Sequence, residues 1–220
     1  MVLLPRINWV SLDMDANTNK PIDIIIVKYG LPDYEQETVE QVMRTVGVPY
    51  HLSVYDNYPL DENLSVVWNR LIKRSNADFV LLLNNDTVPR GSWADKLLEA
   101  MSDPKVGAVG SISNKAGGHQ GGWEKSPEDK VVECVMLSGF CVLIRKAAFD
   151  AIGGFNEAYK LYGEDSDFFR RMKKAGWTLL THYGSYVYHH KAQSTKIAEA
   201  RGKDVEAIKR ESSALFQASL

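Results

Sequence analysis

The stretch FVLLLNND, from Phe79 to Asp86, decides the fold of this chain. Its five consecutive apolar residues are typical of a strand buried on both faces, as in a parallel sheet. Asn84, Asn85 and Asp86 follow where such a strand ends, and ligands of open α/β sheets bind at the carboxyl ends of strands. A carboxylate there indicates a metal–phosphate site, whereas Asn and Asp also favour a turn by bonding their own backbone. The stretch alone leaves both interpretations open.

The sequence on both sides of this stretch alternates β-branched apolar runs with amphipathic segments. Strands are predicted at 22–27, 50–55, 79–83 and 106–112, and helices at 35–46, 64–75 and 92–101, the last with Ser92 as N-cap. This alternation is typical of βαβ units and a parallel sheet. Polar residues end three of the strands, at Lys28-Tyr29, Asp56-Asn57 and Asn84 to Asp86. We therefore predict an α/β fold with a mostly parallel sheet, flanked by helices, and a nucleotide at its carboxyl edge.

The pattern changes after Ser113. The segment from Lys115 to Trp123 contains four glycines and one tryptophan, which indicates either a surface loop or a lid or acceptor-contacting loop. Further along, strand is predicted at 134–145 with a break at Gly139, helix at 146–152 ending at Gly153-Gly154, helix at 164–175, short strands at 177–181 and 185–188, and a helical tail from Thr195.

Composition excludes several classes of protein. The 220 residues suit one large α/β domain, and the 45% apolar and 25% charged shares are those of a soluble globular protein. A net charge of −2 argues against nucleic acid as a partner. No apolar run approaches the length of a membrane span, although peripheral contact with a membrane stays open. Cys134 and Cys141 lie in apolar stretches and predict buried free thiols, consistent with a cytoplasmic protein, at the inner face of the membrane if it touches one.

The helix predicted at 164–175 places one carboxylate on its inward face. Asp165 shares a stripe with Phe168, Phe169 and Met172, at spacings of three, four and seven residues. Its position in the first turn suits either helix capping or a general base that takes a proton from a hydroxyl. Asp167 aligns instead with the two arginines three and four residues on, which predicts a surface ion pair.

His189 and His190 follow a strand of alternating pattern. Consecutive residues of an extended chain point to opposite sides, so at most one of the two is expected to face the site. Together with the Asp86 carboxylate and phosphate oxygens, an imidazole would suit octahedral Mn²⁺ or Mg²⁺.

These motifs, taken in order, resemble the inverting GT-A fold glycosyltransferases of family 2, and among them the bacterial rhamnosyltransferases and other cell-surface sugar transferases. The resemblance rests on Ile22–Tyr29, Tyr55–Asn57, Leu83–Thr87, Ser138–Phe140, Gly153–Glu157, Gly163–Asp167 and Tyr188–His190, and it spans about residues 22 to 195. It implies a Rossmann-like sheet that binds a nucleoside-diphosphate sugar.

The resemblance also implies roles for individual residues. Tyr29, Asp56, Asn84, Asn85 and Asp86 would bind the sugar nucleotide, with Asp56 beside the base and Tyr29 beside base and ribose. Asp86 and His189 would hold the metal, and Asp165 would be the catalytic base. Asn84 stands where the family has its first strand-terminal aspartate, so the site carries less charge than is usual. Only six residues separate Asp56 from Asn63, where the family commonly has more, and the nucleotide base is therefore left open.

The function predicted from the sequence is that of a metal-dependent inverting hexosyl or deoxyhexosyl transferase in polysaccharide or glycoconjugate synthesis. Its acceptor would be a hydroxyl of a glycan, a lipid-linked sugar or a protein, and Trp123, Glu164 and His190 are candidate acceptor contacts. We expect one catalytic domain over 1–220, with a nucleotide-sugar half at 22–112, an acceptor half at 113–195 and a C-terminal helix at 196–220. A sugar nucleotidyltransferase and a non-catalytic sugar-nucleotide or glycan-binding module remain as alternatives.

Overall fold

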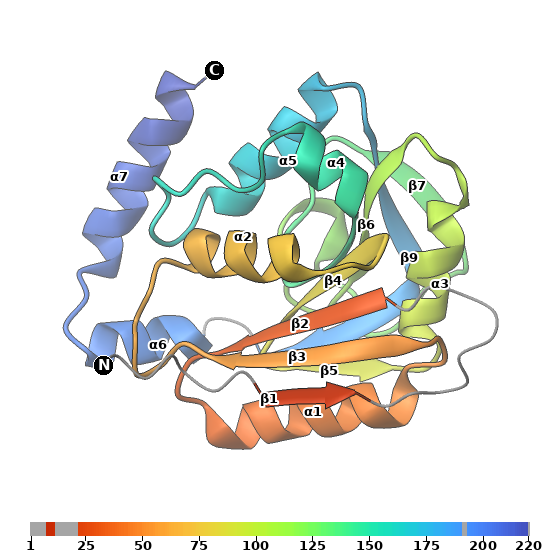
Figure 1. Ribbon diagram of the computed structural model, residues 1–220, viewed down its shortest axis with the longest axis horizontal. Coiled ribbons are helices and arrows are strands. Elements are labelled where there is room, and N and C mark those ends of the chain that lie inside the picture. Colours follow the sequence, from red (N-terminus) through yellow and green to blue (C-terminus); the bar gives the residue numbers. More distant parts are fainter. Residues whose placement is uncertain (1–7, 12–21, 191–192, 220) are drawn as a thin grey trace.

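A computed structural model describes residues 8–11, 22–190 and 193–219, which form a twisted sheet with helices on both faces (Figure 1). The strands are β1 (Asn8–Ser11), β2 (Ile22–Lys28), β3 (Tyr50–Asp56), β4 (Phe79–Asn84), β5 (Thr87–Arg90), β6 (Val106–Ile112), β7 (Val131–Cys134), β8 (Cys141–Arg145) and β9 (Thr178–His189). The helices are α1 (Pro32–Thr45), α2 (Leu64–Arg74), α3 (Trp93–Glu99), α4 (Lys146–Ala151), α5 (Glu164–Lys174), α6 (Gln193–Ala200) and α7 (Val205–Ala218), with short 3₁₀ turns at Ala100–Ser102 and Gly118–Gln120.

The sheet combines a parallel part with a mixed part. Its order is β1-β3-β2-β4-β8-β6-β9-β5, and β7 pairs with β9 beside this path. β2 runs parallel to both β3 and β4, so the three strands end at one edge, as predicted. Beyond β4 the pairing is mixed, because β8 inserts antiparallel between β4 and β6. Nothing in the alternation of strands and helices signals this insertion.

Two apolar cores lie on the two faces of the sheet. Successive side chains of a strand point to opposite faces, so Leu82 packs with α2, α4 and α5, while Leu81 packs with α1 and α3. Trp68, Phe149 and Phe168 are buried in the first core, and Trp93 is fully buried in the second. The continuous apolar run of β4 is therefore explained by burial on both faces.

Several predicted elements differ from the structure. Asn8–Ser11 pairs with β3, although the first twenty residues had been expected to be irregular; the rest of that segment, residues 1–7 and 12–20, lies outside the described residues. Thr87–Arg90 forms the unpredicted strand β5, which carries a proline and pairs only with β9 among the described residues. The two short strands expected at 177–188 are one strand, whose pairing with β6 shifts between His182 and Tyr186. The tail forms two helices, α6 and α7, and Ser92 occupies the N-cap of α3 without a side-chain hydrogen bond.

The remaining strand and helix predictions agree with the structure within a few residues. Val106–Ile112 is a strand with the predicted bounds. Of the strand expected at 134–145, Cys134 is the last residue of β7 and 141–145 form β8, while residues 135–140 are not strand. Cys134 and Cys141 are free and buried, as predicted. Burial raises the pKa of both thiols, that of Cys141 to about 12, so neither is poised as a nucleophile.

Candidate active site

A cavity of about 670 Å³ opens at the edge where β2 and β4 end. Seven of the residues predicted for the site line it: Tyr29, Asn84, Asn85, Asp86, Glu164, Asp165 and His189. Its apolar wall includes Trp68 from α2, Phe140 ahead of β8, and Ile208 from α7. Residues separated by more than a hundred positions in the sequence thus meet in one space of a size that suits a nucleotide sugar.

Asp86 and His189 meet at one side of this cavity. The Oδ1 atom of Asp86 lies 3.1 Å from Nε2 of His189, and both side chains are buried. The other ring nitrogen, Nδ1, is 3.1 Å from the carbonyl oxygen of Lys115, which can only accept, so Nδ1 carries a proton. Phe140 stacks on the imidazole with ring centroids 5.3 Å apart and fixes its plane. In a neutral imidazole, Nε2 therefore presents its lone pair beside the carboxylate.

This donor set fits a divalent cation. Two lone-pair groups side by side repel each other unless a proton or a cation lies between them, and a histidine held through its second nitrogen is the usual arrangement of a metal ligand. No group of three or more histidine, cysteine, aspartate or glutamate side chains is arranged for a metal within the described ranges. The described residues therefore offer Asp86 and His189 as ligands here, and a metal held between them would take its remaining ligands from substrate phosphates or water.

The turn between β4 and β5 is both an ordinary turn and a wall of the cavity. Thr38 of α1 donates its hydroxyl to the carbonyl of Thr87 and accepts from the Thr87 N–H, at 2.8 and 3.2 Å. The side-chain amide of Asn85 donates to Glu35 at 3.2 Å, and Asn85 accepts from Ser194. The two interpretations of the stretch are therefore compatible, since the turn is what aims Asp86 into the cavity.

Glu35 was missed by sequence reasoning and joins two strand ends. Its Oε1 accepts from the backbone N–H groups of Tyr29 and Leu31, at 2.9 and 3.0 Å, besides the amide of Asn85. Leu31 is the N-cap of α1, so the bond resembles the reach-back contact of a capping box. An acidic residue early in a helix was the available signal. Its contact fifty residues away was not predictable from spacing.

Glu164 and Asp165 stand at the start of α5, on another wall of the cavity. The Oδ2 atom of Asp165 accepts from the Gly139 N–H at 3.2 Å, and Oδ1 accepts from the Ser166 N–H at 2.7 Å. Burial raises the pKa of Asp165, and these backbone hydrogen bonds only partly offset the rise. Burial, together with repulsion from Asp165, raises the pKa of Glu164 to about 7. The predicted inward position of Asp165 is confirmed, and its carboxylate is a stronger base than an exposed aspartate.

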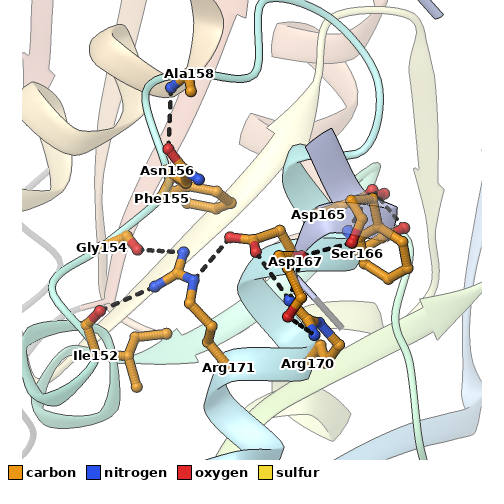
Figure 2. Close-up of polar contacts among 12 residues, drawn as sticks. Ile152, Gly154, Phe155, Asn156, Ala158, Asp165, Ser166, Asp167, Arg170 and Arg171 are labelled. Atoms are coloured by element: carbon orange, nitrogen blue, oxygen red, sulfur yellow. Dashed lines mark hydrogen bonds and ion pairs between the residues drawn. The ribbon is translucent and has the colours of Figure 1, made fainter. Parts of the chain in front are cut away.

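Asp167 corrects one prediction. It pairs with Arg170 and Arg171 as expected, at 3.5 and 2.7 Å, but it is buried rather than on the surface (Figure 2). Arg171 also donates to the carbonyls of Ile152 and Gly154, at 2.9 and 2.7 Å. Helical spacing predicted the partners but not the burial, which depends on tertiary packing; Figure 2 shows the contacts of Arg171 with the segment 152–158. The ion pair thereby ties the start of α5 to that segment.

The wall of the cavity that the loop after β3 forms contains residues that sequence reasoning missed. Asp61 has a left-handed backbone, φ +52°, and accepts hydrogen bonds from the hydroxyl of Tyr29 and from Lys203. Burial alone would raise the pKa of the Asp61 carboxyl, but these two hydrogen bonds outweigh it and hold the pKa below its ordinary value. Arg201 lies over the Tyr58 ring at 4.5 Å and donates to the Tyr58 carbonyl. Asp61 can adopt its left-handed conformation because aspartate, with asparagine, tolerates this region better than most residues do.

The two C-terminal helices close this side. Lys203, between α6 and α7, lines the cavity together with Ser194 and Thr195 of α6. The Thr195 hydroxyl lies 2.6 Å from the hydroxyl of Tyr162, and Ser212 of α7 donates to the Leu161 carbonyl. Figure 1 shows α6 and α7 at one end of the sheet, α7 extending away from it. The sequence predicted helix here but gave no sign that it forms part of the site.

Three predicted site residues lie elsewhere. Asp56 is exposed at the end of β3 and accepts from the Tyr58 N–H, Trp123 packs edge-on against Tyr183, and His190 packs on Tyr34 and contacts Glu37. None of Asp56, Trp123 and His190 is among the residues that line the cavity. The expectation that only one histidine faces the site is met by His189.

Among the described residues, no helix combines the length and apolar character that crossing a membrane requires.

Two solved glycosyltransferase structures have a similar arrangement of elements. GalNAc-T7 with UDP, GalNAc and Mn²⁺ superposes with a TM-score of 0.60 at 14% identity, over 80% of this chain and 44% of that one. The mannosyltransferase PcManGT from Pyrobaculum calidifontis, in complex with GDP-Man and Mn²⁺, gives 0.60 at 12% identity, over 83% and 60%. At such identities the likeness concerns the fold, and it confirms the predicted GT-A-like α/β class.

Sequence comparison gives the family. An N-acetylglucosaminyl-diphospho-decaprenol L-rhamnosyltransferase of Mycobacterium tuberculosis is 32% identical over 149 residues, 54% of this chain and 48% of that protein. The O-antigen biosynthesis protein RfbC of Myxococcus xanthus is 26% identical over 167 residues, 64% of this chain and 12% of its own length. The chain thus spans about half the length of the rhamnosyltransferase and a much smaller part of RfbC. A model of the N-terminal domain of galactosyltransferase matches residues 133–193, and the model of glycosyl transferase family 2 matches residues 11–162, more than half of the chain. The protein belongs to glycosyl transferase family 2, the family that its motifs resemble.

Proposed function

We propose that this chain is the catalytic unit of a metal-dependent inverting glycosyltransferase. It would move a sugar from a nucleoside-diphosphate sugar to an acceptor hydroxyl in the synthesis of a cell-surface polysaccharide or glycoconjugate. The observation that carries the proposal is the meeting, in one cavity, of the Asp86–His189 pair with the Asp165 carboxylate. The first pair suits a cation beside a diphosphate, and the second group suits removal of a proton.

Asp165 is the proposed base. Its carboxylate takes the proton of the acceptor hydroxyl, whose oxygen forms a bond to the anomeric carbon as the bond from that carbon to the diphosphate oxygen breaks. Attack from the face opposite the leaving group inverts the anomeric centre. Hydrogen bonds from Gly139 and Ser166 hold the carboxylate in orientation, and burial makes it more basic. An oriented base of raised pKa is what this step requires.

The donor would lie along the carboxyl ends of β2 and β4. Asp86 and His189 would hold a Mn²⁺ or Mg²⁺ ion, which supplies neutralisation of the charge on the departing diphosphate. Asn84 lines the cavity beside them and offers a neutral amide for hydrogen bonding. Tyr29 and Asp61 are joined by a hydrogen bond, and the nucleotide base would lie beside them. Asp61, rather than the exposed Asp56, lines the cavity there.

The names of the relatives support the class of pathway. One transfers L-rhamnose to N-acetylglucosaminyl-diphospho-decaprenol, and another acts in O-antigen biosynthesis. By extension, the acceptor of this chain is a glycan or a lipid-linked sugar. The nucleotide-sugar half at 22–112 and the acceptor half at 113–195 would act together as one catalytic domain.

Replacement of the proposed base is the direct test. Asp165→Asn should lower transfer from labelled UDP-, GDP- or dTDP-sugars by roughly 10²–10⁴-fold, because asparagine cannot take the proton. Donor binding should be unchanged, measured as the rise in melting temperature that the nucleotide sugar causes in the presence of Mn²⁺. Asp33→Asn is the matched control, since Asp33 is an exposed aspartate in the first turn of α1.

The same assay separates the alternatives. Transfer of the labelled sugar identifies a glycosyltransferase, whereas release of pyrophosphate identifies a nucleotidyltransferase. Donor binding without turnover, in wild type and variant alike, would identify a non-catalytic module. Near-wild-type transfer by Asp165→Asn would show that another group is the base.

A further inference from the structure

Glu164 has a buried carboxyl that the proposed reaction does not use. The residue is 8% exposed, lines the cavity, and its Oε2 atom has no hydrogen-bond partner among the described residues. Buried polar atoms in folded proteins are almost always paired, because an unpaired one has lost its hydration without replacement. A carboxyl oxygen left unpaired at the wall of a binding cavity indicates a partner that comes with the ligand.

The neighbouring carboxylate differs in this respect. Asp165 has both oxygens engaged with backbone N–H groups, at Gly139 and Ser166. Consecutive residues of a helix are about 100° apart around its axis, so Glu164 and Asp165 contact different atoms of a ligand that lies across the start of α5. The proposed donor contacts come instead from the ends of β2, β4 and β9, at Tyr29, Asp86 and His189. Glu164 therefore belongs with the acceptor.

We propose that Glu164 binds a second hydroxyl of the acceptor, next to the hydroxyl that reacts. The acceptor is then a sugar with neighbouring hydroxyls, rather than an isolated alcohol such as a serine side chain. This inference rests on the proposed function, because it takes Asp165 as the group that meets the reacting hydroxyl. Glu164 supplies the second point of contact, which fixes the rotation of the sugar ring about the first.

The electrostatics of the pair agree with this role. Burial and the nearby Asp165 raise the pKa of Glu164 to about 7, so the side chain is protonated in a large fraction of molecules at neutral pH. A neutral carboxyl can both donate and accept a hydrogen bond, as a sugar hydroxyl can. Two adjacent carboxyls are also tolerated in one buried site when one of them is neutral.

Acceptor kinetics test the assignment. Octyl pyranosides of N-acetylglucosamine, glucose, galactose and rhamnose are compared with their monodeoxy analogues and with a serine peptide. Glu164→Ala should raise the KM for the octyl pyranoside about 10-fold or more and leave the donor KM within about twofold. Loss of the neighbouring hydroxyl should cost the wild type about 10-fold in kcat/KM, but cost Glu164→Ala less than about twofold, because the two changes remove the same contact. Glu164→Gln, which keeps a hydrogen-bonding group of the same shape, should remain within about threefold of wild type.

The outcomes are distinguishable from failure of the proposed function. Binding of the octyl pyranosides is followed independently by saturation-transfer NMR, which needs no turnover. If the wild type transferred no sugar but bound the octyl pyranosides, and Glu164→Ala lost the NMR signal of this binding, the proposed function would be contradicted and the contact of Glu164 with the acceptor would be supported. An unchanged acceptor KM and signal in Glu164→Ala, a rise in donor KM alone, or efficient transfer to the serine peptide would overturn the inference. Glu206→Ala, an exposed glutamate in the first turn of α7, is the matched control, and Glu164→Gln reports on the site if Glu164→Ala does not fold.

Discussion

Two acidic regions line the same cavity, and they differ in the group that lies next to the carboxylate. Asp86, at the end of β4, lies 3.1 Å from an imidazole whose other nitrogen is already committed to a carbonyl. Glu164 and Asp165, at the start of α5, lie next to each other, and burial raises the pKa of both. In the proposed function, the first carboxylate would share a cation, while the other two would keep or take protons. Surroundings, rather than residue type, divide the carboxyls between the two tasks.

The largest expected effect comes from the cation side. Asp86→Asn removes the charge of the strand-terminal motif, since Asn84 and Asn85 are already neutral. We expect transfer to fall on the order of 10²–10³-fold, the usual cost of losing one group that stabilises developing charge. Titration of Mn²⁺ against the melting temperature should show weaker binding by roughly 10–100-fold.

Asp56→Asn controls for loss of a carboxylate at a strand end. Asp56 is exposed at the end of β3 and lies outside the lining of the cavity, so Mn²⁺ binding should be unaffected. Equal Mn²⁺ affinity in Asp86→Asn and wild type would remove the distinction between the two acidic regions.

Parts of both acidic regions were predictable from the sequence. A continuous apolar run followed by polar residues marks the end of a buried strand. The ends of β2 and β4 lie side by side because these two neighbouring strands are parallel. The inward position of Asp165 followed from its spacing to Phe168 and Phe169. These inferences use only periodicity, which is a local property of the chain.

Other parts of the site depend on contacts that periodicity does not contain. Lys203 meets Asp61 across 142 positions, and Glu35 meets Asn85 across 50. β8 enters the sheet between β4 and β6, although it follows both in the chain. The burial of Asp167 likewise depends on a distant segment, because the surroundings of a helix face are set by tertiary packing.

Asp167 also shows how the acidic pair at the start of α5 is held in place. Asp167→Asn would leave the Arg171 guanidinium partly buried without its carboxylate, two residues from Asp165. We expect a loss of roughly 2–4 kcal/mol in the free energy of unfolding, below the full cost of a buried pair because Arg171 is partly exposed. Urea denaturation measures it, and Lys146→Met, which breaks the Lys146–Asp150 pair across one turn of α4, should cost less than about 0.5 kcal/mol. A similar small effect of both changes would mean that the buried pair does not fix α5.

The smallest expected effect is a pH dependence of stability, which arises from Glu164 at the start of α5. The pKa of Glu164 rises from 4.5 in the unfolded chain to about 7 in the folded protein, so the folded state holds this proton more tightly. The contribution of Glu164 to stability is therefore greatest below pH 4.5 and is lost as pH rises through 7. Glu164→Gln cannot ionise, and its stability relative to wild type should increase between pH 5 and pH 8, by at most about 3 kcal/mol.

Melting temperatures of the apo protein across this pH range measure the difference. Glu206→Gln removes a glutamate from the first turn of α7, where the side chain is exposed, and should stay close to wild type throughout. If the advantage of Glu164→Gln were the same at pH 5 and pH 8, Glu164 would be ionised at both. The two acidic regions would then differ in their hydrogen-bond partners, but Glu164 would be ionised as Asp86 is expected to be. The division of tasks between the regions would rest on Asp165 alone.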